Sequence, residues 1–253
     1  KEPPVRFIFV LPPKGKAVSK DFGLVLENLD KTLRSIANST NKEYLALVVT
    51  NDPREVGEIT NAYNNVQVIH FPQPRNEDVL NPGSHDKKMK RLFAAGYITT
   101  TANFPLWIMA LDADDLVDKD LVSWVLRKPE NHDYIITRGY ILSANNGQLT
   151  LTRGFHRKSG SRCIFRVEYE DMPENLEDFA SRYAAVLHGL SFSSLRQKGR
   201  RVKRITWPAA LYVRGHSESI SQDPRTKGDK SAQIALRPLH KKILRRLDQA
   251  ALW

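Results

Sequence analysis

The stretch Leu106-Trp107-Ile108-Met109-Ala110-Leu111 runs directly into Asp112-Ala113-Asp114-Asp115. The apolar run is typical of a buried strand, so the carboxylates are expected at its carboxyl end. One Asp would suffice to cap the helix predicted from Asp118, whereas several carboxylates together suit a hard cation such as Mg²⁺ or Mn²⁺. The sequence therefore favours a metal site here over a helix cap.

Strand and helix patterns alternate on both sides of this stretch. Upstream, we predict strands over 5–11, 44–50 and 66–71, a helix over 26–36, a loop reaching Ser84 and a helix over 86–99. Downstream, we predict helices over 118–127 and 175–187, strands over 134–137, 149–155 and 205–213, and a hairpin turn at 145–147. This alternation predicts an α/β fold with a mostly parallel sheet flanked by helices.

Composition narrows the class of protein further. The 253 residues include 13 Gly and 14 Pro, which excludes a collagen-like or low-complexity chain. Cys163 is the one cysteine, so the sequence offers neither an intramolecular disulfide nor a cysteine cluster for zinc, and a reducing, cytoplasmic location is expected. The apolar stretch 104–111 is far shorter than the roughly 18 residues that a membrane helix needs.

The net charge of +11 is concentrated near the end of the chain, where residues 199–253 hold 13 Lys or Arg and 4 Asp or Glu. A helix predicted from Pro238 would carry an apolar stripe of Leu239, Ile243 and Leu247 among basic residues. Such a helix can lie on an anionic membrane, here the inner membrane face. Packing of the stripe against the domain and a solvated basic face remain alternatives.

Five motifs in order carry a family resemblance: the strand ending at Pro12-Pro13, the helix through 29–36, the strand ending at Asn51-Asp52, the run 111–115, and Glu177-Asp178. Over roughly residues 5–222 the chain resembles a family-2-type glycosyltransferase, with the GT-A fold and its Asp-x-Asp element. The resemblance implies a GT-A-type, Rossmann-like domain over 1–222, with a nucleotide-sugar-binding half (5–140) and an acceptor half (141–222). A basic tail with an amphipathic helix would follow over 223–253.

The resemblance also implies a donor site. Leu11, Pro12 and Asp52 would hold the nucleotide base, Asp112 would face the ribose or a metal-bound water, and Asp114 would bind the metal. A strand end at Pro12 and an Asx-Pro turn at Asp52 are the structural alternatives.

A basic helix face precedes the Asp-rich stretch. Helical spacing places Lys87, Lys90 and Arg91 on one side, where they would line a diphosphate pocket. The alternative is an exposed basic face, and the Arg-Asn pair common in the family is missing here.

Two further residues complete the predicted site. Asp178 would be the catalytic base that takes the proton of the acceptor hydroxyl, and Asp171 is the other candidate for this role. The structural alternative is that Asp178 is one of the acidic residues commonly found in the first turn of a helix. His216, after a predicted strand and Gly215, would join Asp112 and Asp114 at the metal or bind the diphosphate. An ordinary surface histidine is the alternative.

The resulting prediction is a glycosyltransferase that depends on Mn²⁺ or Mg²⁺. It would move a hexose or related sugar, with inversion, from a nucleoside-diphosphate sugar, first of all a UDP-sugar, to a glycan or other hydroxyl acceptor in polysaccharide synthesis. A basic nucleic-acid- or polyanion-binding module is one alternative, but it leaves the carboxylates unexplained, so nucleic acid is not the expected partner. A nucleotidyltransferase is another, although the Gly-rich phosphate loop expected of it is reduced to Gly15 and Gly23 within 11–23.

Overall fold

The computed structural model describes residues 4–72, 82–128, 132–172 and 199–219. Its strands are β1 (Phe7–Leu11), β2 (Tyr44–Thr50), β3 (Val66–His70), β4 (Leu106–Ala110), β5 (Leu116–Val117), β6 (Asp133–Ser143), β7 (Gln148–Thr152), β8 (Cys163–Val167) and β9 (Val202–Arg214). Its α-helices are α1 (Phe22–Ala37), α2 (Pro53–Thr60), α3 (Pro82–Thr101) and α4 (Leu121–Leu126). Short 3₁₀ turns are η1 (Lys16–Val18), η2 (Phe155–Arg157) and η3 (Tyr169–Asp171).

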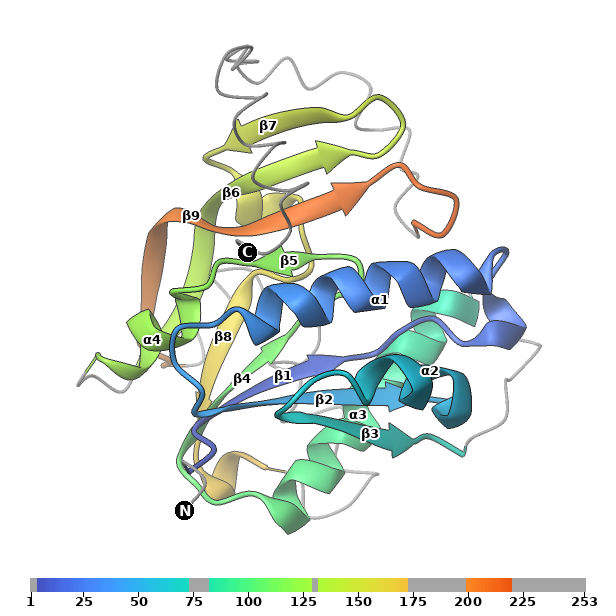
Figure 1. Ribbon diagram of the computed structural model, residues 1–253. Coiled ribbons are helices and arrows are strands. Elements are labelled where there is room, and N and C mark those ends of the chain that lie inside the picture. The colour runs from blue at the N-terminus through green and yellow to red at the C-terminus, as the bar shows by residue number, and fades with distance from the viewer. Residues whose placement is uncertain (1–3, 73–81, 129–131, 173–198, 220–253) are drawn as a thin grey trace.

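Within these residues the nine strands form one sheet in the order β3-β2-β1-β4-β8-β6-β9-β5, with β7 paired to β6 (Figure 1). The first four strands in this order are parallel, and β8 runs antiparallel to both β4 and β6. Phe7 on β1 is in register with both Tyr44 on β2 and Trp107 on β4. The carboxyl ends of β1, β2 and β4 therefore meet at one edge of the sheet.

Helices cover both faces of the parallel part. Leu29 and Leu33 of α1 and Val56 of α2 pack into the core on one face, and Ala95 and Ile98 of α3 pack into the core on the other. Figure 1 shows α1 and α2 on one side of the strands and α3 on the opposite side. The central strands β1 and β4 are buried throughout, as expected for strands covered on both faces. The predicted fold class, α/β with a mostly parallel sheet flanked by helices, is confirmed.

Most of the predicted elements are present with changed ends, and the largest extension is that of the strand predicted over 134–137, which continues as β6 to Ser143. The strand predicted over 44–50 has those bounds, and the hairpin turn at 145–147 is present with Gly147 at φ 64°. The loop predicted to reach Ser84 is wrong, because α3 already begins at Pro82, and proline is well tolerated in a first helical turn. The strand predicted over 149–155 ends at Thr152, and Phe155 lies in η2.

Three elements were absent from the sequence prediction. Helix α2 begins at Pro53, directly after the predicted turn, and the short strands β5 and β8 pair with β9 and β4. The predicted helix over 175–187 and the tail over 223–253 lie outside the described residues. Among the helices that are described, none combines the length and hydropathy needed to cross a bilayer.

Candidate active site

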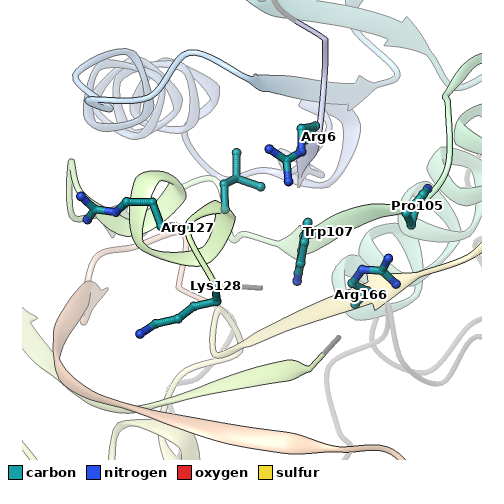
Figure 2. Close-up of a pocket in the computed structure, with 7 residues that line it drawn as sticks. Arg6, Pro105, Trp107, Arg127, Lys128 and Arg166 are labelled. Atoms are coloured by element: carbon teal, nitrogen blue, oxygen red, sulfur yellow. The ribbon is translucent and has the colours of Figure 1, made fainter. Parts of the chain in front are cut away.

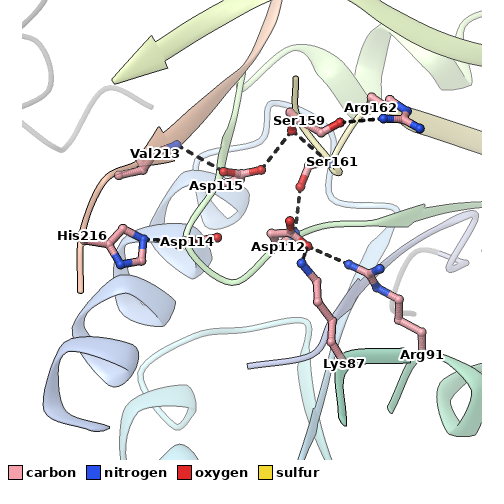
Figure 3. A network of polar contacts seen from close by, with 10 residues as sticks. All are labelled: Lys87, Arg91, Asp112, Asp114, Asp115, Ser159, Ser161, Arg162, Val213 and His216. Atoms are coloured by element: carbon pink, nitrogen blue, oxygen red, sulfur yellow. Dashed lines mark hydrogen bonds and ion pairs between the residues drawn. The ribbon is translucent and has the colours of Figure 1, made fainter. Parts of the chain in front are cut away.

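The predicted donor-site residues gather where β1, β2 and β4 end. In open parallel sheets, ligands bind beyond the carboxyl ends of the strands, because the loops there diverge and leave a crevice. Figure 3 shows the centre of this region, where the loop after β4 meets helix α3, the loop before β8 and the end of β9. Segments far apart in the sequence therefore contribute to one polar network.

Asp112 is held in place by two cations and a serine. Its Oδ1 pairs with Nζ of Lys87 and accepts a hydrogen bond from Nη2 of Arg91 at 2.7 Å. The backbone N–H of Asp112 donates to Oγ of Ser161 at 2.8 Å. Arg91 is 3% exposed and Lys87 is 20% exposed, so the lysine is the cation that a ligand can reach. The structure therefore brings Lys87 and Arg91 to the Asp-rich loop.

Asp114 contacts His216. Oδ2 of Asp114 and Nε2 of His216 are 2.9 Å apart, and the two side chains are 26% and 8% exposed. The buried Nδ1 of His216 has no hydrogen-bond partner among the described residues. The structure thus brings together two predicted metal ligands that are 102 positions apart in the sequence.

The same pair fits two of the ligand positions of a divalent cation. Two oxygen or nitrogen atoms about 2.1 Å from one octahedral ion, at right angles, lie about 3.0 Å apart, which matches the distance between Asp114 and His216. Within the described residues, however, no three His, Cys, Asp or Glu side chains form a group that could hold a metal. Asp112 is directed at Lys87 and Arg91 instead. A cation here would need further ligands from substrate phosphate or water, as is usual for Mg²⁺.

Asp115 has a different environment. Its side chain is fully buried, and it accepts hydrogen bonds from Oγ of Ser159 and the backbone N–H of Val213, both at 3.2 Å. Burial raises the pKa of Asp115 well above its ordinary value, and the neighbouring Asp114 and Asp112 raise it further. Asp115 fastens the Asp-rich loop to the end of β9 and is not exposed to a ligand.

Asp52 lies across from this network at the end of β2. Its Oδ2 accepts the backbone N–H of Lys16 at 2.8 Å, which ties it to the loop after β1. A Cβ on Gly15 would lie 3.1 Å from Oδ1 of Asn51, so the close approach of the two loops favours glycine there. Leu11 and Pro12, the other predicted base contacts, are both buried, and the Leu11 side chain belongs to the core.

Lys90 differs from the other two cations predicted for the diphosphate. Its fully buried Nζ donates to the carbonyl oxygen of Pro13 at 2.9 Å and pairs with Asp86 at 2.8 Å. Burial lowers the pKa of Lys90, and the charges of Asp86 and Asp52 oppose that effect. Lys90 therefore fixes the loop after β1 onto α3, while Lys87 and Arg91 face Asp112.

Glu218 is a residue of this region that the sequence did not single out. Its Oε2 pairs with Lys14 at 2.7 Å, and its Oε1 accepts the backbone N–H groups of Lys20 and Asp21 at 2.8 and 2.7 Å. Burial alone would raise the pKa of Glu218, but Lys14 and the two N–H groups outweigh it and lower the pKa. These three contacts hold the segment that carries His216 against the loop after β1.

The two candidate bases have different outcomes. Asp178 lies outside the described residues. Its rival Asp171 follows β8, at the edge of the sheet where β4 begins, and thus opposite the Asp-rich loop. There its carboxylate accepts the backbone N–H of Glu168 at 3.0 Å and pairs with Arg200 at 3.5 Å.

Comparison with known proteins gives fold-level similarity only. No protein-family model matches the chain, and no curated protein sequence matches it. Among solved structures, S. aureus TarS 1-349 is 10% identical, with a TM-score of 0.43; the match covers 82% of this chain and 60% of that one. The 4-diphosphocytidyl-2C-methyl-D-erythritol synthase of Anaerococcus prevotii is 12% identical, with 95% and 96% coverage and a TM-score of 0.45.

The inositol-1-phosphate CTP transferase of T. maritima is 11% identical, with 88% and 93% coverage and a TM-score of 0.45. WbbM, described as a bifunctional glycosyltransferase, is 11% identical, with 84% and 46% coverage and a TM-score of 0.40, so the neighbours include a glycosyltransferase as well as a CTP transferase. Because their TM-scores are below 0.5, the function of this chain has to be argued from its own site.

Proposed function

We propose that this chain is a glycosyltransferase that uses a nucleoside-diphosphate sugar and depends on Mn²⁺ or Mg²⁺. The observation that carries the proposal is the contact of Asp114 with His216, next to an Asp112 held by Lys87 and Arg91, at the carboxyl edge of a parallel sheet. An anionic donor needs cations at its phosphates. This edge of the sheet supplies two basic side chains, and the Asp114–His216 pair offers an oxygen and a nitrogen of the kinds that bind divalent cations.

Each residue has a role in this proposal. Asp114 and His216 hold the divalent cation, which when bound would neutralise charge on the leaving diphosphate. Lys87, one-fifth exposed, is the basic side chain that can turn from Asp112 toward a donor phosphate. Asp52, which follows β2, is assigned the contact with the nucleoside in this proposal.

The transfer step needs a base. The acceptor oxygen bonds to the anomeric carbon while the bond from that carbon to the diphosphate oxygen breaks, and the hydroxyl proton passes to a carboxylate. We assign that carboxylate to Asp178. The alternative Asp171 is disfavoured by its position at the opposite edge of the sheet and by its pairing with Arg200.

Nucleotidyl transfer is the second candidate, because the loop after β1 carries a further cation, Lys14, which is 19% exposed and would suit the longer phosphate chain of a nucleoside triphosphate. The two reactions differ in their products. Glycosyl transfer releases a nucleoside diphosphate from a nucleotide sugar. Nucleotidyl transfer joins the nucleotide of a nucleoside triphosphate to a sugar phosphate and releases pyrophosphate.

The test is to measure both products with a panel of nucleotide sugars, and with nucleoside triphosphates plus sugar 1-phosphates, in Mn²⁺ or in excess chelator. Asp114→Asn should abolish metal-supported turnover, whereas the control Asp120→Asn, at an exposed carboxylate bound to Thr40, should not. Calorimetry should show weak binding of nucleoside diphosphate without the cation. Equal affinity in chelator, or unchanged turnover by D114N, would remove the metal from the proposal, and release of pyrophosphate alone would favour nucleotidyl transfer.

A further inference from the structure

A second charged region lies at the other edge of the sheet, where β1 and β4 begin. A cavity of about 360 Å³ opens there. It is lined by Arg6, Pro105, Trp107, Leu126, Arg127, Lys128 and Arg166 (Figure 2). With a rise of about 3.3 Å per residue, β4 separates Trp107 from Asp112 by roughly 16 Å, so this basic cavity is distinct from the candidate active site.

The lining is strongly cationic. Four of the seven residues are Arg or Lys and none is acidic. Two of these cations have partners outside the lining: Arg6 pairs with Glu43 at 3.3 Å, and Arg166 pairs with Glu168.

The other two cations, Arg127 and Lys128, have no carboxylate partner within the described part of the chain. Both are exposed, and Lys128 lies over the Trp124 ring at 5.0 Å. In Figure 2 their side chains extend outward from the end of α4. Exposed side chains of this kind change rotamer within nanoseconds, so they can turn toward an anion without moving the backbone.

The cavity also has a more buried side, formed by Trp107 and Arg166. Trp107 is 5% exposed, and the Arg166 guanidinium lies 5.3 Å from its ring centroid. The two residues are direct partners in the antiparallel β4–β8 ladder, which fixes their separation. In Figure 2 the Arg166 side chain lies beside the Trp107 ring, and Arg6 lies above that ring in the view. Part of the site is therefore formed before any ligand arrives.

We propose that the basic cavity binds a small anion carrying two or more negative charges, of the phosphate or polycarboxylate kind. Guanidinium groups match the paired oxygens of both chemistries, and three of the four cations are arginines. The volume is at the lower end of the range for small-molecule sites, about 300–1,000 Å³, which suits a compact ligand. This site is independent of the donor site and needs no divalent cation.

The experiment is calorimetric titration of the full chain in buffer freed of metal on a chelating resin. Pyrophosphate and citrate are the two probes, and they distinguish phosphate from carboxylate chemistry. The test variant is R127Q/K128Q, and K31Q/R153Q is a matched control that removes two exposed positive charges from other elements. D114N reports on the candidate active site.

We expect the wild type, K31Q/R153Q and D114N to bind at least one probe with the same affinity, and R127Q/K128Q to bind it roughly tenfold or more weakly, since each charged hydrogen bond contributes about that factor. Tighter binding of pyrophosphate than of citrate would identify a phosphate site, and the reverse a carboxylate site. Absence of binding by the wild type, unchanged binding by R127Q/K128Q, or loss of binding in D114N would overturn the proposal.

Discussion

Replacing Glu218 by glutamine should destabilise the fold by about 2–4 kcal/mol, because a buried carboxylate would be lost from a charged network. The Glu218 side chain is 3% exposed and its partner Lys14 is 19% exposed. In E218Q the amide oxygen can replace Oε1 and still accept the N–H groups of Lys20 and Asp21. The amide nitrogen then replaces Oε2 and directs two donors at the Lys14 ammonium.

The magnitude follows from these contacts. A hydrogen bond to a charged group contributes about 1.5–3 kcal/mol, and the ammonium of Lys14 keeps only partial access to water once its acceptor is gone. Removing both partners should cost less than removing one, since the penalty comes from the stranded charge. E218Q combined with Lys14→Met should therefore recover part of the lost stability.

Urea unfolding followed by circular dichroism measures the effect as a fall in the urea midpoint at unchanged slope. The matched control is Glu55→Gln, because Glu55 pairs with Lys16 on the surface, where loss of the pair should leave the midpoint almost unchanged. Equal midpoints for the wild type, E218Q and E55Q would refute the reasoning, as would a double variant with Lys14→Met that is no more stable than E218Q.

The pH dependence of this difference has a defined sign. The pKa of Glu218 is lowered by folding from its ordinary value of 4.5, so the folded state binds its proton less readily than the unfolded chain does. The stabilisation is fully present above pH 4.5 and is lost as the pH falls through the lower folded pKa. The stability gap between wild type and E218Q should therefore be wide at pH 7 and narrow in acid.

Three further changes have expected outcomes. Gly139→Ala should lower stability by about 1–3 kcal/mol in thermal unfolding, because the new Cβ would lie 2.7 Å from a backbone oxygen, whereas Gly154→Ala meets only ordinary contacts and serves as its control. Asp133→Asn should cost about 2–4 kcal/mol in urea unfolding, because it breaks the two-point pairing of a buried carboxylate with Arg200; an unchanged midpoint would contradict this. Removing residues 237–253 should abolish salt-sensitive sedimentation with anionic vesicles and leave donor turnover intact; unfolding on truncation would instead assign the apolar stripe to the core.

The parallel part of the fold was predictable because its elements follow local periodicity. The apolar runs over 44–50 and 106–111 form strands that are buried on both faces, and such runs can be recognised as strands from the sequence alone. Helix α2 was missed because Val56 and Thr60 are its only buried residues, too few to establish a helical period. Strand β8 has five residues and begins at Cys163, and it depends on pairing with β4 more than on its own pattern.

The candidate site was predictable only where its residues share a motif. The Asp-rich loop follows directly from a strand, and the basic residues of α3 are near neighbours in sequence. Glu218 was missed because its partner Lys14 lies 204 positions away and no local pattern connects them. Burial of Lys90 was hidden for the same reason, since one of its acceptors is the Pro13 carbonyl, 77 positions upstream.

The end of β9 and the turn after it hold the candidate site together. Within six residues, Val213 donates to Asp115, His216 contacts Asp114, and Glu218 pairs with Lys14. These contacts reach two separate loops at the carboxyl edge of the parallel strands. β6 and β9 pair with two register shifts. The position of residues 213–218 therefore depends on the backbone conformation at these two irregularities. A change in the β6–β9 register would move all three contacts together, so the geometry of the Asp114–His216 pair depends on the parallel β6–β9 pair as well as on β1, β2 and β4.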